Sequence, residues 1–183
     1  MKRLAQEAVI VSLARRLRDE GSWAGETHIQ KAAYLLRELF GVPFDFDFIL
    51  YKHGPFSFEL RDELSAMRSD RLIDRETQPA PYGPRIVATE RGRQLEERFQ
   101  RTMSRYGDYV EWVVNRVGDR GVVELERLAT ALWVTREMGE ATAVQRRAEA
   151  LNEVKPHVSI SDAVEAVKEI DSFIAEASGN ALC

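Results

Sequence analysis

The stretch from residue 44 to residue 68 constrains the fold more than any other part of the chain. Its first half alternates aromatic side chains with polar ones at a period of two, and the aromatic members are Phe44, Phe46 and Phe48. This period predicts a half-buried strand over residues 44–52. Gly54 and Pro55 then interrupt the pattern, and a proline in the first turn of a helix loses no hydrogen bond. A helix over residues 56–68 follows, so the order is strand, tight turn, helix.

Two helices are predicted before this stretch. Apolar residues recur at helical spacing over residues 3–20 and again over 28–40. The first span begins with a basic pair but lacks a small-residue cleavage site, so we interpret it as a helix and not as a signal peptide. Thr27 and Gln30 have the spacing of a capping box that starts the second helix. Gly41 stands where a helix commonly ends.

A two-stranded wing is predicted after the third helix. Residues 71–74 and 85–88 have strand character, and a loop rich in proline separates them. Thr89 follows as the cap of another helix. Helix, helix, strand, helix and wing, over Thr27 to Thr89, form the pattern of a winged-helix module with its wing at residues 71–88.

No strand is predicted after residue 92, and the apolar spacing indicates helices to the end of the chain. The expected fold class is therefore α+β and mainly helical. We expect a winged-helix-like part over residues 1–92 and a C-terminal helical bundle over 93–183 packed on it. The two parts together can also form one continuous domain.

Composition limits the classes of protein that fit. The net charge of −4, from 26 basic and 30 acidic residues, argues against broad electrostatic capture of nucleic acid. No apolar run approaches the roughly 20 residues that a membrane span needs. Cys183 is the only cysteine, which excludes a disulfide framework and a thiolate metal cluster. We expect a cytoplasmic protein that does not bind membranes.

Several short motifs resemble the YwgA-like bacterial proteins. In that family a helix beginning with Leu or Ile, Gln and Lys, as in residues 29–31, precedes an aromatic strand and a Gly-Pro turn, as in residues 51–57. The resemblance continues through residues 125–130 and 155–157, although His53 stands where an aromatic residue is common. It implies a winged-helix-type fold but little about activity, because the family is largely uncharacterised. A more distant similarity to the Panacea-type antitoxin domain implies neutralisation of a toxin.

The third helix and the wing are the candidate binding surface. In a winged helix that reads DNA, the third helix enters the major groove and the wing contacts the backbone. Three acidic side chains outnumber two arginines on the expected outer face of this helix, which disfavours phosphate. A solvated or protein-binding face is the main alternative. The side chains predicted to contact DNA or a protein partner are Arg61, Arg68, Arg71, Arg85 and Arg91.

Two further sites have alternative interpretations. Lys52 and His53, before the third helix, are a candidate anion site, and the alternative is that both face water. Trp112, Val113 and Trp133 are a candidate dimer surface, and the alternative is that they complete the core. The histidines follow no metal-binding pattern, and no nucleophile or phosphate-loop motif occurs. We therefore expect no catalytic site, no metal and no cofactor.

The resulting functional hypothesis is a non-enzymatic bacterial regulatory or defence-associated binding protein, similar to an antitoxin or an adaptor. It would act through protein contacts, with a protein partner or as a homodimer. The alternative is a transcriptional repressor that binds DNA through the helix at 56–68 and the wing at 71–88.

Overall fold

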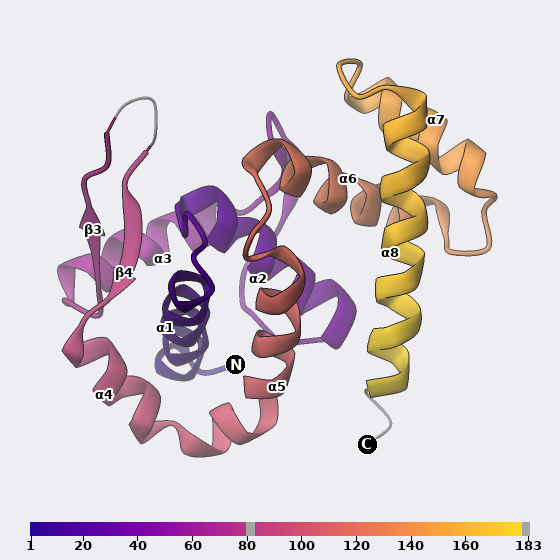
Figure 1. The fold of residues 1–183 in the computed structure, drawn as a ribbon. Helices are drawn as coiled ribbons and strands as arrows, with labels where there is room; N and C mark the ends of the chain where they lie inside the picture. Colours follow the sequence, from indigo (N-terminus) through magenta and orange to yellow (C-terminus); the bar gives the residue numbers. More distant parts are fainter. Residues whose placement is uncertain (80–82, 181–183) are drawn as a thin grey trace. The chain divides into compact units, whose positions relative to one another are not determined.

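The computed structural model describes residues 1–79 and 83–180, and these are mainly helical (Figure 1). The predicted class, α+β and mainly helical, is confirmed, with two small antiparallel sheets of two strands each. The elements are α1 (Arg3–Asp19), α2 (Glu26–Phe40), β1 (Ile49–Tyr51), β2 (Gly54–Phe56), α3 (Phe58–Ser69), β3 (Ile73–Glu76), β4 (Arg85–Ala88), α4 (Glu90–Arg98), α5 (Gln100–Val117), α6 (Val122–Met138), α7 (Val144–Val154) and α8 (Ile160–Asn180).

The chain divides into two compact units. Unit 1 contains Met1–Phe48 and Ser57–Arg120, and unit 2 contains Ile49–Phe56 and the chain from Gly121 onward. Residue 92, where we expected one part to end, lies within α4. The predicted domain division stays a prediction, and each unit is described by itself below.

Helix α1 is the centre of unit 1. Every residue from Ala5 to Ala14 is buried, and α2, α4, α5 and β4 pack around the helix. A helix that is buried on all sides needs small and branched side chains to let its neighbours approach, and Ala8, Val9 and Ala14 are fully inaccessible. The two predicted N-terminal helices are confirmed, including the left-handed Gly41 that ends α2.

The predicted capping box at Thr27 and Gln30 is wrong. Helix α2 begins earlier, at Glu26, after Gly25, and no side chain caps it. The Gln30 side chain instead reaches Ser57, the residue before α3. Gln30 Nε2 donates to the Ser57 carbonyl oxygen and the Ser57 amide donates to Gln30 Oε1, both at 2.9 Å. Buried polar groups need such partners, so α2 fixes the start of α3.

The predicted strand at 44–52 is only partly correct. Burial alternates as expected, with Phe44 and Phe46 buried and Asp45 and Asp47 exposed. Ladder pairing, however, is confined to β1, which pairs with β2 across a turn at Lys52 and His53. Residues 44–48 therefore bury alternate aromatic rings without belonging to a strand.

Helix α3 begins two residues later than predicted. Pro55 lies in β2, opposite Leu50, and not in the first helical turn. After the tight turn at Lys52 and His53, Gly54 begins this short edge strand with a φ of +80°, and a proline is tolerated in an edge strand. Ser57 then caps α3 by accepting a hydrogen bond from the Leu60 amide at 3.1 Å.

The two strands after α3 form the expected hairpin. Strand β3 pairs antiparallel with β4, from Ile73 opposite Ala88 to Glu76 opposite Arg85. The predicted strand at 71–74 starts two residues later than expected, and part of the predicted loop, residues 80–82, lies outside the described residues. Thr89 caps α4 by accepting from the Gly92 amide, as predicted.

Unit 2 is built from α6, α7 and α8, which pack against one another, with the β1–β2 hairpin on α6. Arg147 is almost fully buried between these helices. It forms a two-pronged contact with Asp171 at 2.6 and 2.8 Å and also donates to the Thr142 carbonyl oxygen at 2.8 Å. A buried guanidinium is tolerated only when it is paired in this way, so this contact joins α7 to α8.

Candidate binding surface

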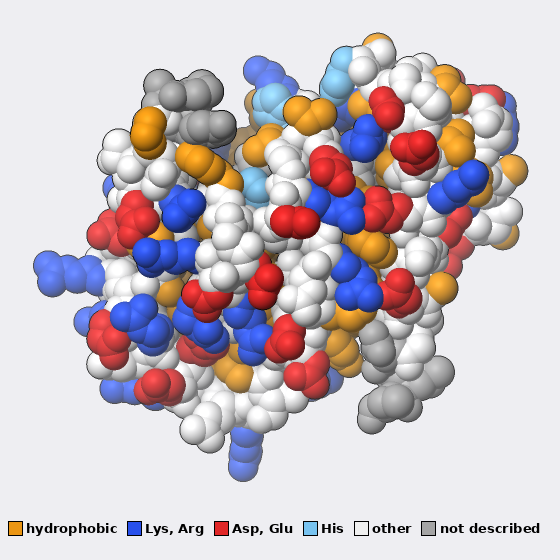
Figure 2. Space-filling model, in the orientation of Figure 1, with side chains coloured by type: hydrophobic (Ala, Val, Ile, Leu, Met, Phe, Trp, Pro, Cys, Tyr) orange, Lys and Arg blue, Asp and Glu red, His pale blue; other side chains and the backbone are white. Residues whose placement is uncertain are grey.

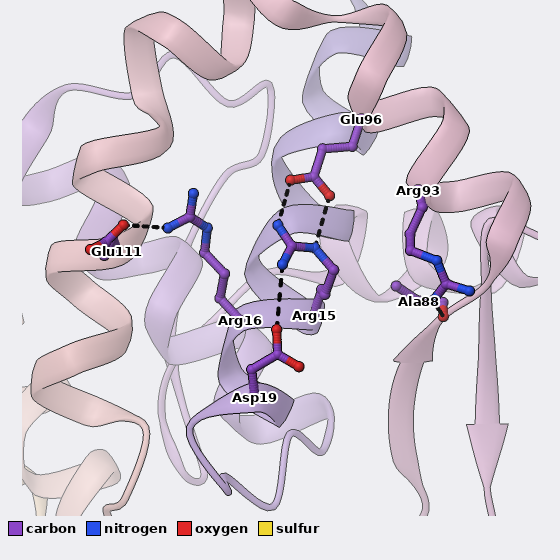
Figure 3. A network of polar contacts seen from close by, with 7 residues as sticks. All are labelled: Arg15, Arg16, Asp19, Ala88, Arg93, Glu96 and Glu111. Carbon is purple, nitrogen blue, oxygen red and sulfur yellow. Dashed lines mark hydrogen bonds and ion pairs between the residues drawn. The ribbon is translucent and has the colours of Figure 1, made fainter.

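Two sets of arginines in unit 1 differ in their contacts, and those of the first set are paired with carboxylates. Figure 3 shows Arg15 between Glu96 and Asp19, and Arg16 pointing to Glu111. The Arg15 contacts with Glu96 measure 2.9 and 3.2 Å, and Arg16 Nη1 lies 2.6 Å from Glu111 Oε2. These pairs join α1 to α4 and α5.

The surface around these pairs has little net charge. Figure 2 shows blue and red side chains interleaved over α1, α4 and α5 on the viewed face. A shallow hollow of about 380 Å³ there is lined by Arg15, Arg16, Asp19, Glu20 and Glu111, together with Val114 and Asn115. Each guanidinium already has a carboxylate partner, so this face offers little attraction to an anionic ligand.

The second set of arginines lines a groove of about 490 Å³. We call it the arginine groove, and it is formed by Arg68, Arg71, Ile73, Asp74, Thr89, Glu90 and Arg91. Three of the five predicted binding arginines therefore come together. They arise from three different elements: the last turn of α3, the turn into β3, and the first turn of α4.

Thr89 holds the turn that carries Arg71. Its hydroxyl donates to the Arg71 carbonyl oxygen at 2.6 Å, and its amide donates to the Leu72 carbonyl oxygen at 3.1 Å. Arg71 has a φ of +58°, which is uncommon for a residue with a side chain. Such a conformation persists when the surroundings impose it, as these hydrogen bonds do.

The arginine groove carries excess positive charge. Among the described residues, Arg68, Arg71 and Arg91 take part in no ion pair. Of the two acidic groups in the lining, Glu90 is paired with Arg93 at 2.8 Å, which leaves Asp74 alone to offset the three guanidiniums. Unpaired guanidiniums bind carboxylates and phosphates through two parallel hydrogen bonds, so the groove suits an anionic group.

A second groove adjoins the first one. It has a volume of about 730 Å³ and shares Glu90 and Arg91 with the arginine groove. We call it the leucine groove because it is lined by three leucines, which come from α1, from the turn before β3 and from α4. Its lining is Leu4, Glu7, Asp70, Leu72, Glu90, Arg91, Gln94, Leu95 and Arg98.

Glu7 is the unusual residue of the leucine groove. Its side chain is 1% exposed, and neither carboxyl oxygen has a hydrogen-bond partner among the described residues. Arg3 Nη2 lies 3.2 Å from Glu7 Oε1, and Arg3 Nε lies 3.0 Å from Glu63 Oε1. Burial, with the carboxyl group of Glu63 nearby, raises the pKa of Glu7 to about 7. The Arg3 guanidinium also lies 3.9 Å from Asp70, so it is shared among three carboxyl groups, and Glu7 holds a proton more readily than an ordinary glutamate.

The two other predicted arginines lie outside the arginine groove. Arg61 stacks over the Phe58 ring at 4.9 Å and lies 3.7 Å from Asp62 on the exposed side of α3. Arg85 is half-buried, and its guanidinium lies 5.8 Å from the centre of the Trp23 ring. Both are in unit 1, but their local contacts differ from those of the groove arginines.

The predicted anion site at Lys52 and His53 has an acidic neighbour in unit 2. His53 Nδ1 lies 3.2 Å from Glu126 Oε2. Burial opposes the ionisation of Glu126, but Lys155 and His53 hold its pKa below its ordinary value. Lys155 Nζ is 2.8 Å from this carboxylate and also donates to the carbonyl oxygens of Tyr51 and Lys52.

This cluster has an evident structural role, since buried Lys155 and Glu126 attach the β1–β2 turn to α6. The close packing of the turn on α6 also requires glycine at position 54, because a Cβ there would lie 2.9 Å from Thr130 Oγ1. A carboxylate beside His53 repels an anion. The anion site stays a prediction that this neighbour disfavours.

The residues of the candidate dimer surface lie in different units. Val113 is fully buried within unit 1 and so adds no accessible surface there. Trp112 is half-buried and packs against the Phe40 ring, and Arg116 lies over it at 3.8 Å. Trp133 is half-buried in unit 2. A role in dimerisation stays a prediction for the two tryptophans.

Neither a membrane segment nor a metal-binding cluster occurs in the described part of the chain. Each helix within residues 1–79 and 83–180 is too short or too polar to cross a lipid bilayer. The same residues hold no group of three or more His, Cys, Asp or Glu side chains arranged to bind a metal ion.

Comparison with known proteins identifies no relative: no protein-family model matches the chain, and no curated protein matches it. The resemblance to YwgA-like proteins stays a prediction. The structure adds that two of the motifs behind it meet physically, through the Gln30 contacts with Ser57.

Sequence reasoning overlooked Glu7 and the leucine groove. Glu7 was a usable signal, because it lies at the start of the apolar stretch of the first helix, next to Gln6 and before Ala8. An acidic residue on a buried helix face is uncommon and points to a special environment. Leu4, Leu72 and Leu95 could not be grouped beforehand, since each belongs to a different element.

Proposed function

We propose that this chain is a non-enzymatic binding protein, similar to an antitoxin or adaptor, that acts through contacts with a protein partner. The observation that carries the proposal is the arginine groove, which Arg68, Arg71 and Arg91 line without ion-pair partners among the described residues. Other arginines of the same unit are paired with carboxylates. An unpaired cluster beside paired ones favours recognition of an anionic group on another molecule.

The scaffold in this proposal is a winged helix. Unit 1 supplies α1, α2 and α3, followed by the β3–β4 hairpin as the wing and then α4. In this arrangement the arginine groove lies at the C-terminal end of α3 and at the base of the wing. That is away from the N-terminal end of the third helix, which such proteins commonly direct at base edges.

The alternative function is a DNA-binding repressor, and the same arginines favour it because guanidiniums also bind phosphate. The exposed face of α3 argues the other way. Its exposed acids, Glu59 and Asp62, balance its exposed arginines, Arg61 and Arg68. The Glu59 amide and the Ser57 side chain keep the pKa of Glu59 below its ordinary value, so a negative charge stays at the start of α3. That charge would face the phosphates of a bound duplex.

Binding measurements on the purified full chain separate the two functions. We expect no salt-dependent binding to DNA fragments, including the region upstream of its own gene. We also expect a protein partner to co-purify from the source cells and to re-form the complex when both proteins are purified separately. Reversing the groove charges with R68E/R71E/R91E should weaken that complex, whereas R101E, an exposed charge reversal on α5, should not. Tight DNA binding that weakens steeply with salt, with no reconstituted protein complex, would overturn the proposal.

A further inference from the structure

We infer that the arginine groove and the leucine groove together bind one acidic amphipathic segment of a protein partner. The inference rests on the proposed function and specifies the chemistry of the partner. Carboxylates of the segment would contact Arg68, Arg71 and Arg91, and an apolar side chain beside them would enter the leucine groove.

The two grooves form one continuous surface of unit 1. Glu90 and Arg91, in the first turn of α4, line both of them. The arginine groove extends from there toward the end of α3, and the leucine groove extends toward the start of α1. A segment that passes over the first turn of α4 therefore contacts both grooves.

The leucine groove provides an apolar contact. Leu4 is 53% exposed, and Leu72, also in the lining, is 5% exposed. Leu95 from α4 completes the apolar lining. Covering a half-exposed leucine with an apolar side chain gains free energy in proportion to the area removed from water. An occupant with only charged groups would leave this contribution unused.

The charges of the leucine groove favour a protein segment over nucleic acid. Besides Arg91 and Arg98, this groove is lined by the exposed carboxyl groups of Asp70 and Glu90. A phosphate backbone carries a negative charge at every nucleotide and would bring phosphates near both groups. A peptide can place carboxylates only over the arginine groove and an apolar or donor group over the leucine groove.

Fluorescence anisotropy of labelled helical peptides with the purified full chain tests the inference. In the first peptide, leucines recur at helical spacing and glutamates flank them. In the second, serine replaces every leucine, and in the third, lysine replaces every glutamate. The first peptide should bind most tightly. R68E/R71E/R91E should weaken its binding by about tenfold or more, and R101E should change it by less than about twofold.

The variant L4S tests the apolar contact separately, and because Leu4 is more than half exposed the variant should fold as the parent does. It should weaken binding of the leucine peptide by about fivefold and leave binding of the serine peptide unchanged. Three results would overturn the inference: no binding of the first peptide at concentrations up to about 1 mM, equal binding of the first two peptides, or displacement of the first peptide by duplex DNA at matched charge. If a purified partner protein binds but tolerates both L4S and R68E/R71E/R91E, the inference fails while the protein-binding function stands.

Discussion

Substituting Glu7 with glutamine should remove part of the dependence of the free energy of unfolding on pH. The side chain is 1% exposed, and burial is the main cause that raises the pKa of Glu7 from 4.5 to about 7. A carboxyl group that holds its proton more tightly when folded stabilises the fold below pH 4.5, and this contribution is lost as the pH rises through 7. Glutamine cannot ionise, so E7Q should escape that loss.

The size of the effect follows from the shift. A pKa raised from 4.5 to about 7 corresponds to at most about 3 kcal/mol of the free energy of unfolding. Glu63 and Asp70 contribute part of this shift and titrate together with Glu7, so we expect about 1–2 kcal/mol from Glu7 itself between pH 4.5 and 8. His28 acts in the opposite direction, because burial lowers its pKa and its protonation destabilises the fold as the pH falls below 6.5.

Urea unfolding at several pH values between 4.5 and 8 measures this difference. Trp23 and Trp112 lie in unit 1 and Trp133 in unit 2, so a W133F background confines the tryptophan signal to unit 1. The stability of E7Q relative to the parent should increase with pH. The control E97Q, an exposed substitution on α4, should have a curve of stability against pH that is parallel to that of the parent. Parallel profiles for E7Q and the parent would refute the assigned ionisation of Glu7.

Three more substitutions test the packing. Gln30→Ala removes two hydrogen bonds from the buried start of α3 and should cost about 2 kcal/mol in urea unfolding; an unchanged midpoint would contradict the role of Gln30. Gly92→Ala would place a Cβ 2.1 Å from the Leu72 carbonyl oxygen and should cost about 3 kcal/mol or more, whereas alanine at Gly121, where the space is open, should be tolerated. Arg147→Lys loses a two-pronged carboxylate contact and should lower the thermal midpoint of unit 2, followed by Trp133 fluorescence, by several degrees, about 2 kcal/mol.

Local signals predicted most of the elements. Helical periodicity located α1 and α2, and Gly41 ended a helix and Thr89 capped one as expected. These features depend on neighbours within a few residues, which a single sequence displays. Conformations that depend on distant partners were the ones predicted wrongly.

The spacing of Thr27 and Gln30 shows why such predictions fail. Their sequence pattern fits a capping box, but the Gln30 amide instead satisfies the backbone of Ser57, which is 27 residues away. Pro55 likewise pairs in a hairpin because Gly54 turns the chain, although its sequence position fits a helix start. In both cases a tertiary contact outweighed the local preference.

The sequence predicted the arginines of the arginine groove but not how they are grouped. Composition and position marked Arg68, Arg71 and Arg91 as candidates, since they flank the expected wing. Their separation from Arg61 and Arg85 depends on which arginines find aromatic or carboxylate partners, and those partners come from elsewhere in the fold.

Photo-crosslinking at position 91 in the source cells tests the central claim most directly. A crosslinking amino acid in place of Arg91, compared with one in place of exposed Arg101, reports what lies against the arginine groove. The account predicts a protein adduct at position 91 that is absent at position 101 and is lost when R68E/R71E is added. DNA adducts at position 91, or the same adducts at both positions, would contradict it.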